Sequence, residues 1–288
     1  MIKKIINNEI IDMESTRARG LTFWVKNYEQ INKTIPSIKN RTTAFSKNDL
    51  SGDTECIKNE IKNLEKTKDK FAKKISEYLS YHKVWSDWLD GVPGIGPALG
   101  GKLLSLYYYK SVAVCDKCGK DLIRIEGSNG DHGRLECSGC GKKSKGDGVL
   151  NYRIEDRDFS TISKWWKFMG RHTVDGKMPK RKKGVKIDWR TDGRTCTYLI
   201  AEQFVKNGNK YREFYDKEKA KIVLKRPDAT KGHIDNMAKH NTIQLFLSHF
   251  WLVARTIDGK PVTDPYYAVS VLGHNKDHII EPYYWDGN

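Results

Sequence analysis

Residues 91–105, with the sequence GVPGIGPALGGKLLS, decide the fold that we expect. The stretch is unusually apolar and glycine-rich for a surface loop, and it is much shorter than the roughly 20 apolar residues that span a membrane. Gly91 suits the end of one helix, and Pro97 suits the first turn of the next. The pattern therefore predicts a helix-hairpin-helix unit over residues 90–111.

The chemistry of this hairpin is expected to come from its backbone. Gly94 and Gly96 permit a tight turn that brings main-chain N–H groups to the surface, where the helix dipole favours an anion. Ile95 between them is expected to pack into the hairpin's own core. Lys102, one turn into the second helix, is predicted to add a positive charge for the same phosphate. An ordinary turn between two helices is the alternative interpretation.

A heptad pattern precedes the hairpin and predicts one long helix over residues 57–89. A coiled coil that forms a homodimer is one interpretation, and a helix that packs on its own domain is the other. Residues 1–56 show no decisive pattern and are expected to be an N-terminal arm or short helices. The apolar seam contains Ile57, Ile61, Leu64, Lys68, Phe71, Ile75, Tyr78, His82, Trp85 and Leu89.

Four cysteines occur in two copies of a C-x-x-C-G-K motif, at Cys115, Cys118, Cys137 and Cys140. Two residues between thiols allow one tight turn to direct both sulfurs at one ion, and four thiolates favour Zn²⁺ over Mg²⁺ or Ca²⁺. The short spacer alternates like small strands. We therefore predict a structural zinc ribbon, inserted at residues 112–148. Disulfides and an iron–sulfur cluster are the alternatives.

The rest of the chain is predicted to be mainly helical. Residues 149–266 contain an aromatic amphipathic segment at 159–172, two short helical segments and one long helical segment that ends near Gly259. Residues 267–288 form an aromatic, irregular tail. A basic loop at 173–184 interrupts the helices, and it carries Lys177, Lys180, Arg181, Lys182 and Lys183. This run is expected to clamp a phosphate backbone, with a solvated surface as the alternative.

The composition points to a polyanionic partner. The 288 residues carry 52 Lys and Arg against 36 Asp and Glu, a formal net charge of +16. The N-terminus does not resemble a signal peptide, and no stretch is apolar enough for a membrane span. We expect a cytoplasmic protein of prokaryotic, viral or mobile-element origin that binds nucleic acid, most simply DNA, with RNA left open and no small-molecule substrate evident.

The order of motifs resembles a known family. The hairpin VPGIGPALGGKLL, the segment FSTISKWWKFMG, the basic loop, FYDKEKAK and KGHIDNMAKHNTIQLFLSHFWLVAR occur in the succession found in the C-terminal domain of the IS-one-ten and IS-eleven-eleven insertion-sequence transposases. The resemblance covers roughly residues 75–266, with the zinc ribbon as an insertion. Family members also have a RuvC-like nuclease domain and a coiled coil, and a serine of the C-terminal domain attacks DNA.

Two departures from the family bear on activity. Residues 1–56 are too few for a RuvC-like domain and lack its carboxylate set. At the position that resembles the family's serine this chain has Asp175, and the nearest hydroxyl belongs to Thr173. The interpretation is a transposase-derived DNA-binding protein that grips the phosphate backbone, without the strand-transfer chemistry.

Two other classes of function remain open from the sequence. One is an active recombinase or junction nuclease, with Thr173, Ser160 or Ser163 as nucleophile, or with a metal held by Asp175, Asp188 and His172. The other is an RNA-binding or virion-associated structural protein. Common loop and helix-cap chemistry also explains most of these polar residues.

Overall fold

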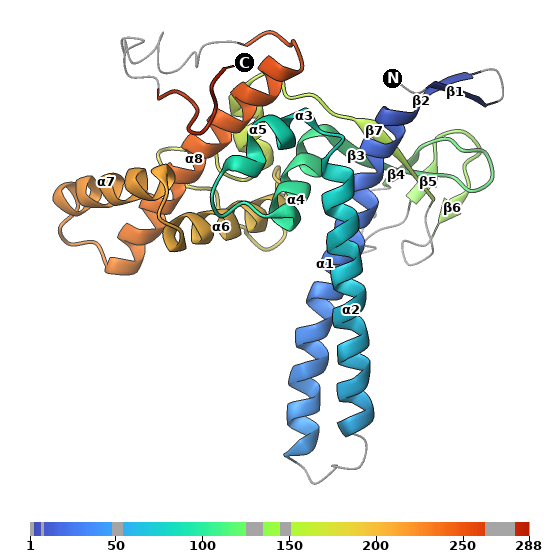
Figure 1. Ribbon diagram of the computed structural model, residues 1–288, viewed down its shortest axis with the longest axis horizontal. Helices are drawn as coiled ribbons and strands as arrows, with labels where there is room; N and C mark the ends of the chain where they lie inside the picture. Colours follow the sequence, from blue (N-terminus) through green and yellow to red (C-terminus); the bar gives the residue numbers. More distant parts are fainter. Residues whose placement is uncertain are drawn as a thin grey trace. The chain divides into compact units, whose positions relative to one another are not determined.

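The computed structural model describes residues 3–6, 9–47, 54–124, 135–144, 151–262 and 280–287 (Figure 1). The chain divides into two compact units, and each is described by itself. The first comprises Met1–Leu104 and Phe159–Asn288, and the second comprises Ser105–Asp158. Within the described ranges the protein is mainly helical, as the sequence predicted, with small sheets.

The elements of the chain follow the expected order of a hairpin, a β insertion and further helices. The helices are α1 (Met13–Ser46), α2 (Thr54–Leu79), α3 (Lys83–Asp87), the 3₁₀ helix η2 (Leu89–Gly91), α4 (Pro97–Tyr108), α5 (Ile162–Phe168), α6 (Thr191–Lys206), α7 (Lys210–Lys225) and α8 (Lys231–Ile257). The strands are β1 (Lys3–Ile6), β2 (Glu9–Asp12), β3 (Tyr109–Val114), β4 (Leu122–Arg124), β5 (Leu135–Cys137), β6 (Lys143–Ser144) and β7 (Asn151–Asp156).

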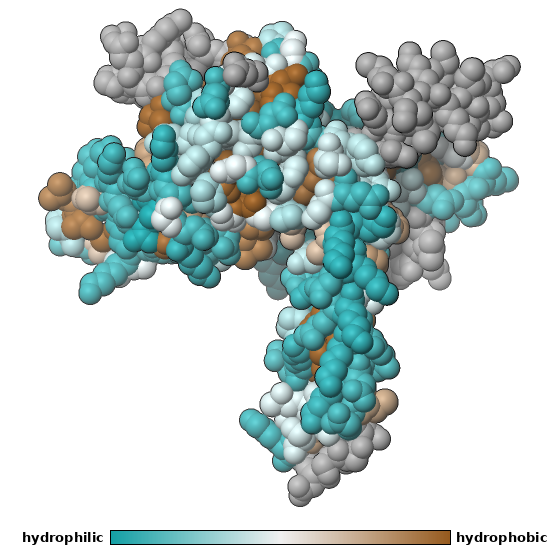
Figure 2. Space-filling model, viewed as in Figure 1, coloured by the Kyte–Doolittle hydropathy of each residue, from teal (hydrophilic) through white to brown (hydrophobic). Residues whose placement is uncertain are grey.

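The expectation of an arm or short helices at residues 1–56 is wrong, because α1 is a single helix of 34 residues. It lies beside α2, and the two form a helical hairpin (Figure 1). Leu21 and Val25 of α1 and Ile61 and Ile75 of α2 are buried, whereas the outer surface of both helices is mostly hydrophilic (Figure 2). The N-terminal pattern was missed because α1 packs along only a narrow apolar stripe.

The predicted helix over residues 57–89 is interrupted. α2 ends at Leu79, whose carbonyl accepts from His82 N–H at 2.9 Å, and His82 is extended (φ −109°, ψ 108°) before α3 begins. Weak helix formers at Tyr81 and His82 allow this break, and the turn buries His82 in the unit. The seam of α2 packs against α1 of the same chain, so its burial does not require a second copy.

An aromatic core joins α8 to its neighbours in the first unit. Trp88 stacks on Phe246, with ring centroids 6.0 Å apart, and Trp165 of α5 stacks on Phe250 at 5.9 Å. Such buried rings supply much of the apolar area that a core removes from water. The three helical segments predicted after the basic loop are α6, α7 and α8, and α8 ends just before Gly259 (φ 64°).

The described part of the tail packs on this core. The indole N–H of Trp88 donates to Tyr283 O at 2.7 Å, and Lys210 N–H donates to Tyr284 Oη at 2.8 Å. The other tail residues, 267–279 and Asn288, lie outside the described ranges. Among the helices that the structure describes, none has the length and apolar character needed to cross a lipid bilayer.

The second unit is a β insertion with a two-stranded stem. Strands β3 and β7 pair antiparallel from Tyr109↔Asp156 to Val114↔Asn151, and β4, β5 and β6 form a separate three-stranded sheet. The insertion predicted at 112–148 is therefore present as a small β unit whose stem extends a few residues further on both sides.

Candidate metal centre and nucleic-acid interface

The four predicted cysteine ligands come together in the second unit. The sulfurs of Cys115, Cys118, Cys137 and Cys140 all lie within 4.8 Å of one another. The Cys115–Cys140 pair is 3.8 Å apart and the Cys118–Cys137 pair is 3.3 Å apart. A tetrahedral site with Zn–S bonds of about 2.3 Å requires sulfur–sulfur distances of about 3.8 Å. The cluster can therefore hold a metal ion with little adjustment.

Both cysteine motifs fold into the same tight turn. In the first, the N–H of Cys115 donates to Lys120 O at 2.8 Å, and Gly119 N–H donates to Cys115 O at 2.9 Å. In the second, the N–H of Cys137 donates to Lys142 O at 3.0 Å, and Gly141 N–H donates to Cys137 O at 3.1 Å. The two glycines have φ values of 70° and 67°, which side chains disfavour. The glycine after each C-x-x-C pair is thus required by the turn.

The sulfurs of Cys118 and Cys137 are hydrogen-bonded to each other, and the pKa values of the two thiols are shifted in opposite directions. Backbone N–H groups of Cys140 and Gly139 point at the Cys137 sulfur and lower its pKa to about 6. The N–H of Lys120 acts to lower the pKa of Cys118, but the hydrogen bond with Cys137 and burial raise it to about 11. N–H donors that stabilise a thiolate favour metal binding, since the thiolate is the ligand.

At the position predicted for the hairpin, the structure has a tight turn between η2 and α4 in the first unit. Gly94 has φ 95°, a conformation that favours glycine. Ile95 is buried as expected, with 4% of its surface exposed, and its N–H donates to Val92 O. Gly91 ends η2, and Val92 is its cap. The sequence thus placed the turn correctly.

Helix α4 begins at Pro97, and its first turn leaves backbone donors available. The first bond into the helix runs from Gly100 N–H to Gly96 O at 2.9 Å. The N–H groups of Ala98 and Leu99 precede it, and such groups have no partner within their own helix. These donors, with the positive end of the helix dipole, can hold an anion.

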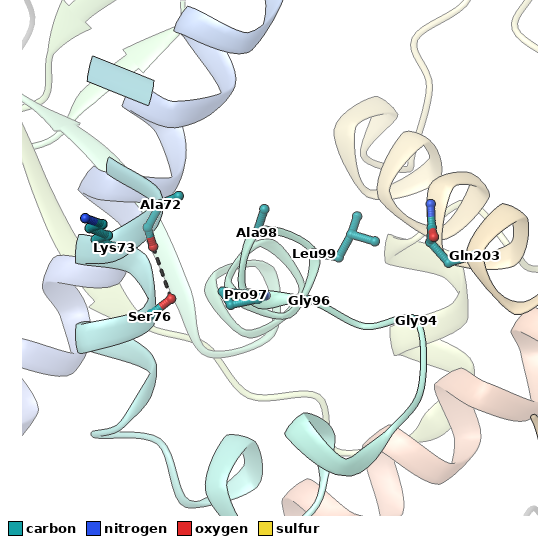
Figure 3. Close-up of a pocket in the computed structure, with 9 residues that line it drawn as sticks. All are labelled: Ala72, Lys73, Ser76, Gly94, Gly96, Pro97, Ala98, Leu99 and Gln203. Carbon is teal, nitrogen blue, oxygen red and sulfur yellow. Dashed lines mark hydrogen bonds between the residues drawn. The ribbon is translucent and has the colours of Figure 1, made fainter. Parts of the chain in front are cut away.

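A cavity of about 450 Å³ opens at this helix start. Figure 3 shows the start of α4 between α2, which contributes Lys73 and Ser76, and α6, which contributes Gln203. A side chain at Gly94 would meet Gln203, with their Cβ atoms 3.2 Å apart. Gly96, in contrast, faces open space. The hairpin backbone is therefore accessible mainly at Gly96 and the first turn of α4.

Lys102 does not provide the charge that the sequence predicted for this site. It is 7% exposed, and its ammonium pairs with Glu29 at 2.7 Å and with Asp192 at 3.3 Å. Burial acts to raise the pKa of Asp192, but hydrogen bonds from Arg190 and Lys102 and their charges hold it well below its usual range. Lys102 is therefore part of a buried ion-pair network that joins α1, α4 and α6.

Another lysine, Lys73, lines the cavity, and Lys206 lies on the same helix as the lining residue Gln203; the sequence predicted a role for neither. Lys73 lines the cavity from α2, and Lys206 follows Gln203 by three residues on α6, so that the two share a helix face. Both are exposed. Because each belongs to a helix distant in sequence from the hairpin, only a signal for helix packing could have identified them.

The basic loop is as exposed as predicted. Within the described part of the chain its cations form no ion pair with a carboxylate. The exposed cations are Lys177, Lys180, Arg181, Lys182 and Lys183. Pro179 O accepts from Arg194 Nη1 at 2.8 Å, which fixes the loop to α6. The loop therefore presents a concentrated positive charge to solvent.

Asp175 is accounted for by the local backbone. Val174 and Lys177 exchange two hydrogen bonds, of 2.9 and 3.0 Å, around Asp175 (φ 50°) and Gly176 (φ 70°). Two central residues with positive φ define a hairpin turn for which Asp-Gly is a preferred pair. Thr173 is exposed beside it. The position that resembles the family's serine thus has a turn-forming role.

Among the described residues, Asp175, Asp188 and His172 are not grouped as metal ligands. Ser160 accepts from Lys164 Nζ, and Ser163 is an exposed residue of α5. Asp188 pairs with Lys167 at 2.9 Å, which holds the pKa of Asp188 below its usual range. In the part of the chain that the structure describes, the cysteine cluster is the one group arranged as metal ligands, and His172 is not in it.

Comparisons with protein-family models, with curated proteins and with solved structures give no match to this chain.

Proposed function

We propose that this protein binds nucleic acid through the sugar–phosphate backbone, with DNA as the ligand. The observation that carries the proposal is the basic loop, whose five cations are exposed and not neutralised by carboxylates of the described chain. Such a loop releases condensed counterions when it meets a polyanion, and this supplies sequence-independent affinity. The net charge of +16 acts in the same direction by steering the encounter.

The hairpin supports the same function by a different interaction. Ala98 and Leu99 offer backbone donors at the start of α4, in the cavity that exposed Lys73 also lines. Backbone donors bind phosphates and do not contact the base edges, so they do not distinguish one sequence from another. Loop and hairpin together therefore bind many sequences with similar affinity.

The cysteine cluster is proposed to hold one structural Zn²⁺. Four thiolates in a tetrahedral arrangement leave no open position for substrate, and soft sulfur ligands suit zinc. The ion would stabilise the β insertion, whose small sheets contain too few residues for an apolar core of their own. Descent from the insertion-sequence transposases, with loss of strand transfer at Asp175, is our proposal for the chain's origin.

Fluorescence anisotropy with labelled ligands tests the proposal. Duplex DNA, a four-way junction, single-stranded DNA and structured RNA are titrated at several salt concentrations, with and without Mg²⁺, and the products are checked for cleavage. We expect similar affinities for unrelated DNA sequences and a steep salt dependence. A preference for the RNA would replace DNA as the ligand, and Mg²⁺-dependent cleavage would contradict a purely binding role.

A quadruple variant identifies the surface responsible. Changing Lys180, Arg181, Lys182 and Lys183 to Ala should lower the salt slope by up to about 0.9 for each phosphate that the loop no longer neutralises. A matched control removes four exposed lysines of α2, namely Lys58, Lys62, Lys66 and Lys70. If both variants weaken binding equally, the loop has no specific part and only net charge matters.

A further inference from the structure

A buried arginine and a partly buried one lie where the basic loop is attached to α6. Arg171 follows α5 and is 7% exposed, yet no carboxylate of the described chain is within ion-pairing distance of it. Its Nε donates to Thr197 Oγ1 at 2.8 Å and its Nη2 donates to Arg194 O at 3.3 Å. A guanidinium has five N–H donors, so three of those of Arg171 have no acceptor among the described residues.

Arg194 lies next to it on α6 and is also without a carboxylate partner among the described residues. Its Nη1 donates to Pro179 O, and its guanidinium lies 5.7 Å from the ring centre of Trp189. The pKa values of both arginines are lowered, mainly by burial, that of Arg171 to about 10. Two partly desolvated positive charges without a counterion are costly to a fold.

His240 of α8 adds a third polar group without a partner. It is 8% exposed, and neither Nδ1 nor Nε2 has a hydrogen-bond partner within the described ranges of the chain. One turn further along α8, Gln244 Nε2 donates to Arg171 O at 2.8 Å, so the face of α8 that carries His240 meets Arg171. Burial and the charges of Arg171 and Arg194 lower the pKa of His240 to about 4. A neutral imidazole still has one N–H to donate.

The three side chains have N–H donors in common, and none of them has an anionic partner among the described residues. We propose that Arg171 and Arg194, with His240 beside them, form a binding site for a phosphate group. Planar guanidinium groups match phosphate oxygens in a bidentate geometry, and their weak hydration suits a buried ion pair. Because Arg194 also holds the basic loop at Pro179, the site adjoins the loop. That the phosphate belongs to a nucleic-acid backbone rests on the function proposed above.

Thermal unfolding of the full chain in inorganic phosphate, compared with chloride at equal ionic strength, tests the site. We expect about 10 mM phosphate to raise the Tm by about 3 °C or more, because only the folded chain has the site. Arg194→Gln should abolish this rise. Arg226→Gln, which removes the same charge from an exposed position after α7, should retain it. An equal rise in both variants, or none in the parent, overturns the proposal.

A second measurement does not depend on the stability of variants. In NMR spectra of the parent chain, the imidazole signals of His240, assigned with His240→Gln, should shift and saturate as phosphate is added. Unshifted signals would contradict the site. A single-stranded oligonucleotide without terminal phosphates then distinguishes the ligand. If phosphate binds and the oligonucleotide does not, the site binds free phosphate only, and the proposed function in nucleic-acid binding is contradicted. If the oligonucleotide binds and phosphate neither raises the Tm nor shifts His240, the site fails alone.

Discussion

The cysteine cluster of the β insertion, here called the ribbon, and the hairpin before α4 both depend on glycine turns. They differ in which parts of the chain supply their functional groups. Each pair of cysteines lies within one turn, so the spacing alone directs both sulfurs at a common point. The hairpin also forms locally, yet the side chains around it come from α2 and α6. A site built inside a turn follows from the motif, whereas one built between helices depends on the packing.

The ribbon should respond most strongly to a single change. Cys137→Ser removes one of the four proposed metal ligands, and structural zinc sites contribute on the order of 10 kcal/mol to folding. We expect the variant to lose bound metal and the β insertion to unfold, while the helical unit retains its structure. Elemental analysis and circular dichroism measure the two effects. Cys56→Ser is the control, because Cys56 is exposed and outside the cluster; equal metal content in both variants would contradict the site.

Two lysines near the hairpin, Lys102 and Lys73, should affect different properties, one the stability of the fold and the other the affinity for DNA. Lys102→Met leaves Glu29 without its partner and should lower the free energy of unfolding by about 3 kcal/mol, with little effect on DNA affinity. Lys73→Met, at the exposed edge of the cavity, should do the reverse. Urea unfolding and anisotropy titrations of both variants decide this. A stable Lys102→Met protein with weakened binding would restore the role that the sequence predicted.

A buried histidine of the helical unit should make stability depend on pH, whereas removal of metal should not alter that dependence. His249 Nε2 donates to Ile280 O, and Nδ1 is hydrogen-bonded to Tyr211 Oη, each at 2.9 Å. Burial lowers the pKa of His249 to about 4. The folded state therefore resists protonation, and the stability present above about pH 6.5 declines as the pH falls.

At pH 5 this decline amounts to about 2 kcal/mol relative to pH 7. Urea unfolding of His249→Gln should show a correspondingly flatter pH dependence. His233→Gln changes an exposed histidine and should leave the dependence unchanged. A parent chain whose stability does not change between pH 7 and 5 would be inconsistent with a neutral, buried His249.

The sequence predicted local structure well and long-range partners poorly. Pro97 at the start of α4, Gly94 in the turn and the four cysteines were all identified from spacing, because each follows from backbone chemistry within a few residues. Lys102 was misassigned since its partners lie 73 and 90 residues away. The arginine cluster was missed for the same reason, because α5, α6 and α8 must pack before Arg171 meets His240.

The smallest expected effect is a difference between valine substitutions at the two hairpin glycines, which look equivalent in the sequence. Gly94→Val forces a side chain into a backbone with φ 95° and against Asn207 and Gln203, so it should destabilise the unit by at least about 1–2 kcal/mol. Gly96 has open space for a side chain, and Gly96→Val should cost at most a helix-cap preference. If the first turn of α4 holds a phosphate, the new side chain should obstruct it and remove roughly one charged hydrogen bond, about a tenfold decrease in DNA affinity.

Gly96→Ser is the matched variant for this last comparison, because serine caps the helix and occupies less space than valine. Circular dichroism and anisotropy on the same samples should give the order Gly, Ser, Val in affinity, with similar helix content throughout. If a folded Gly96→Val protein binds DNA as tightly as the parent, the hairpin serves only as a turn, and the basic loop must provide the affinity without it.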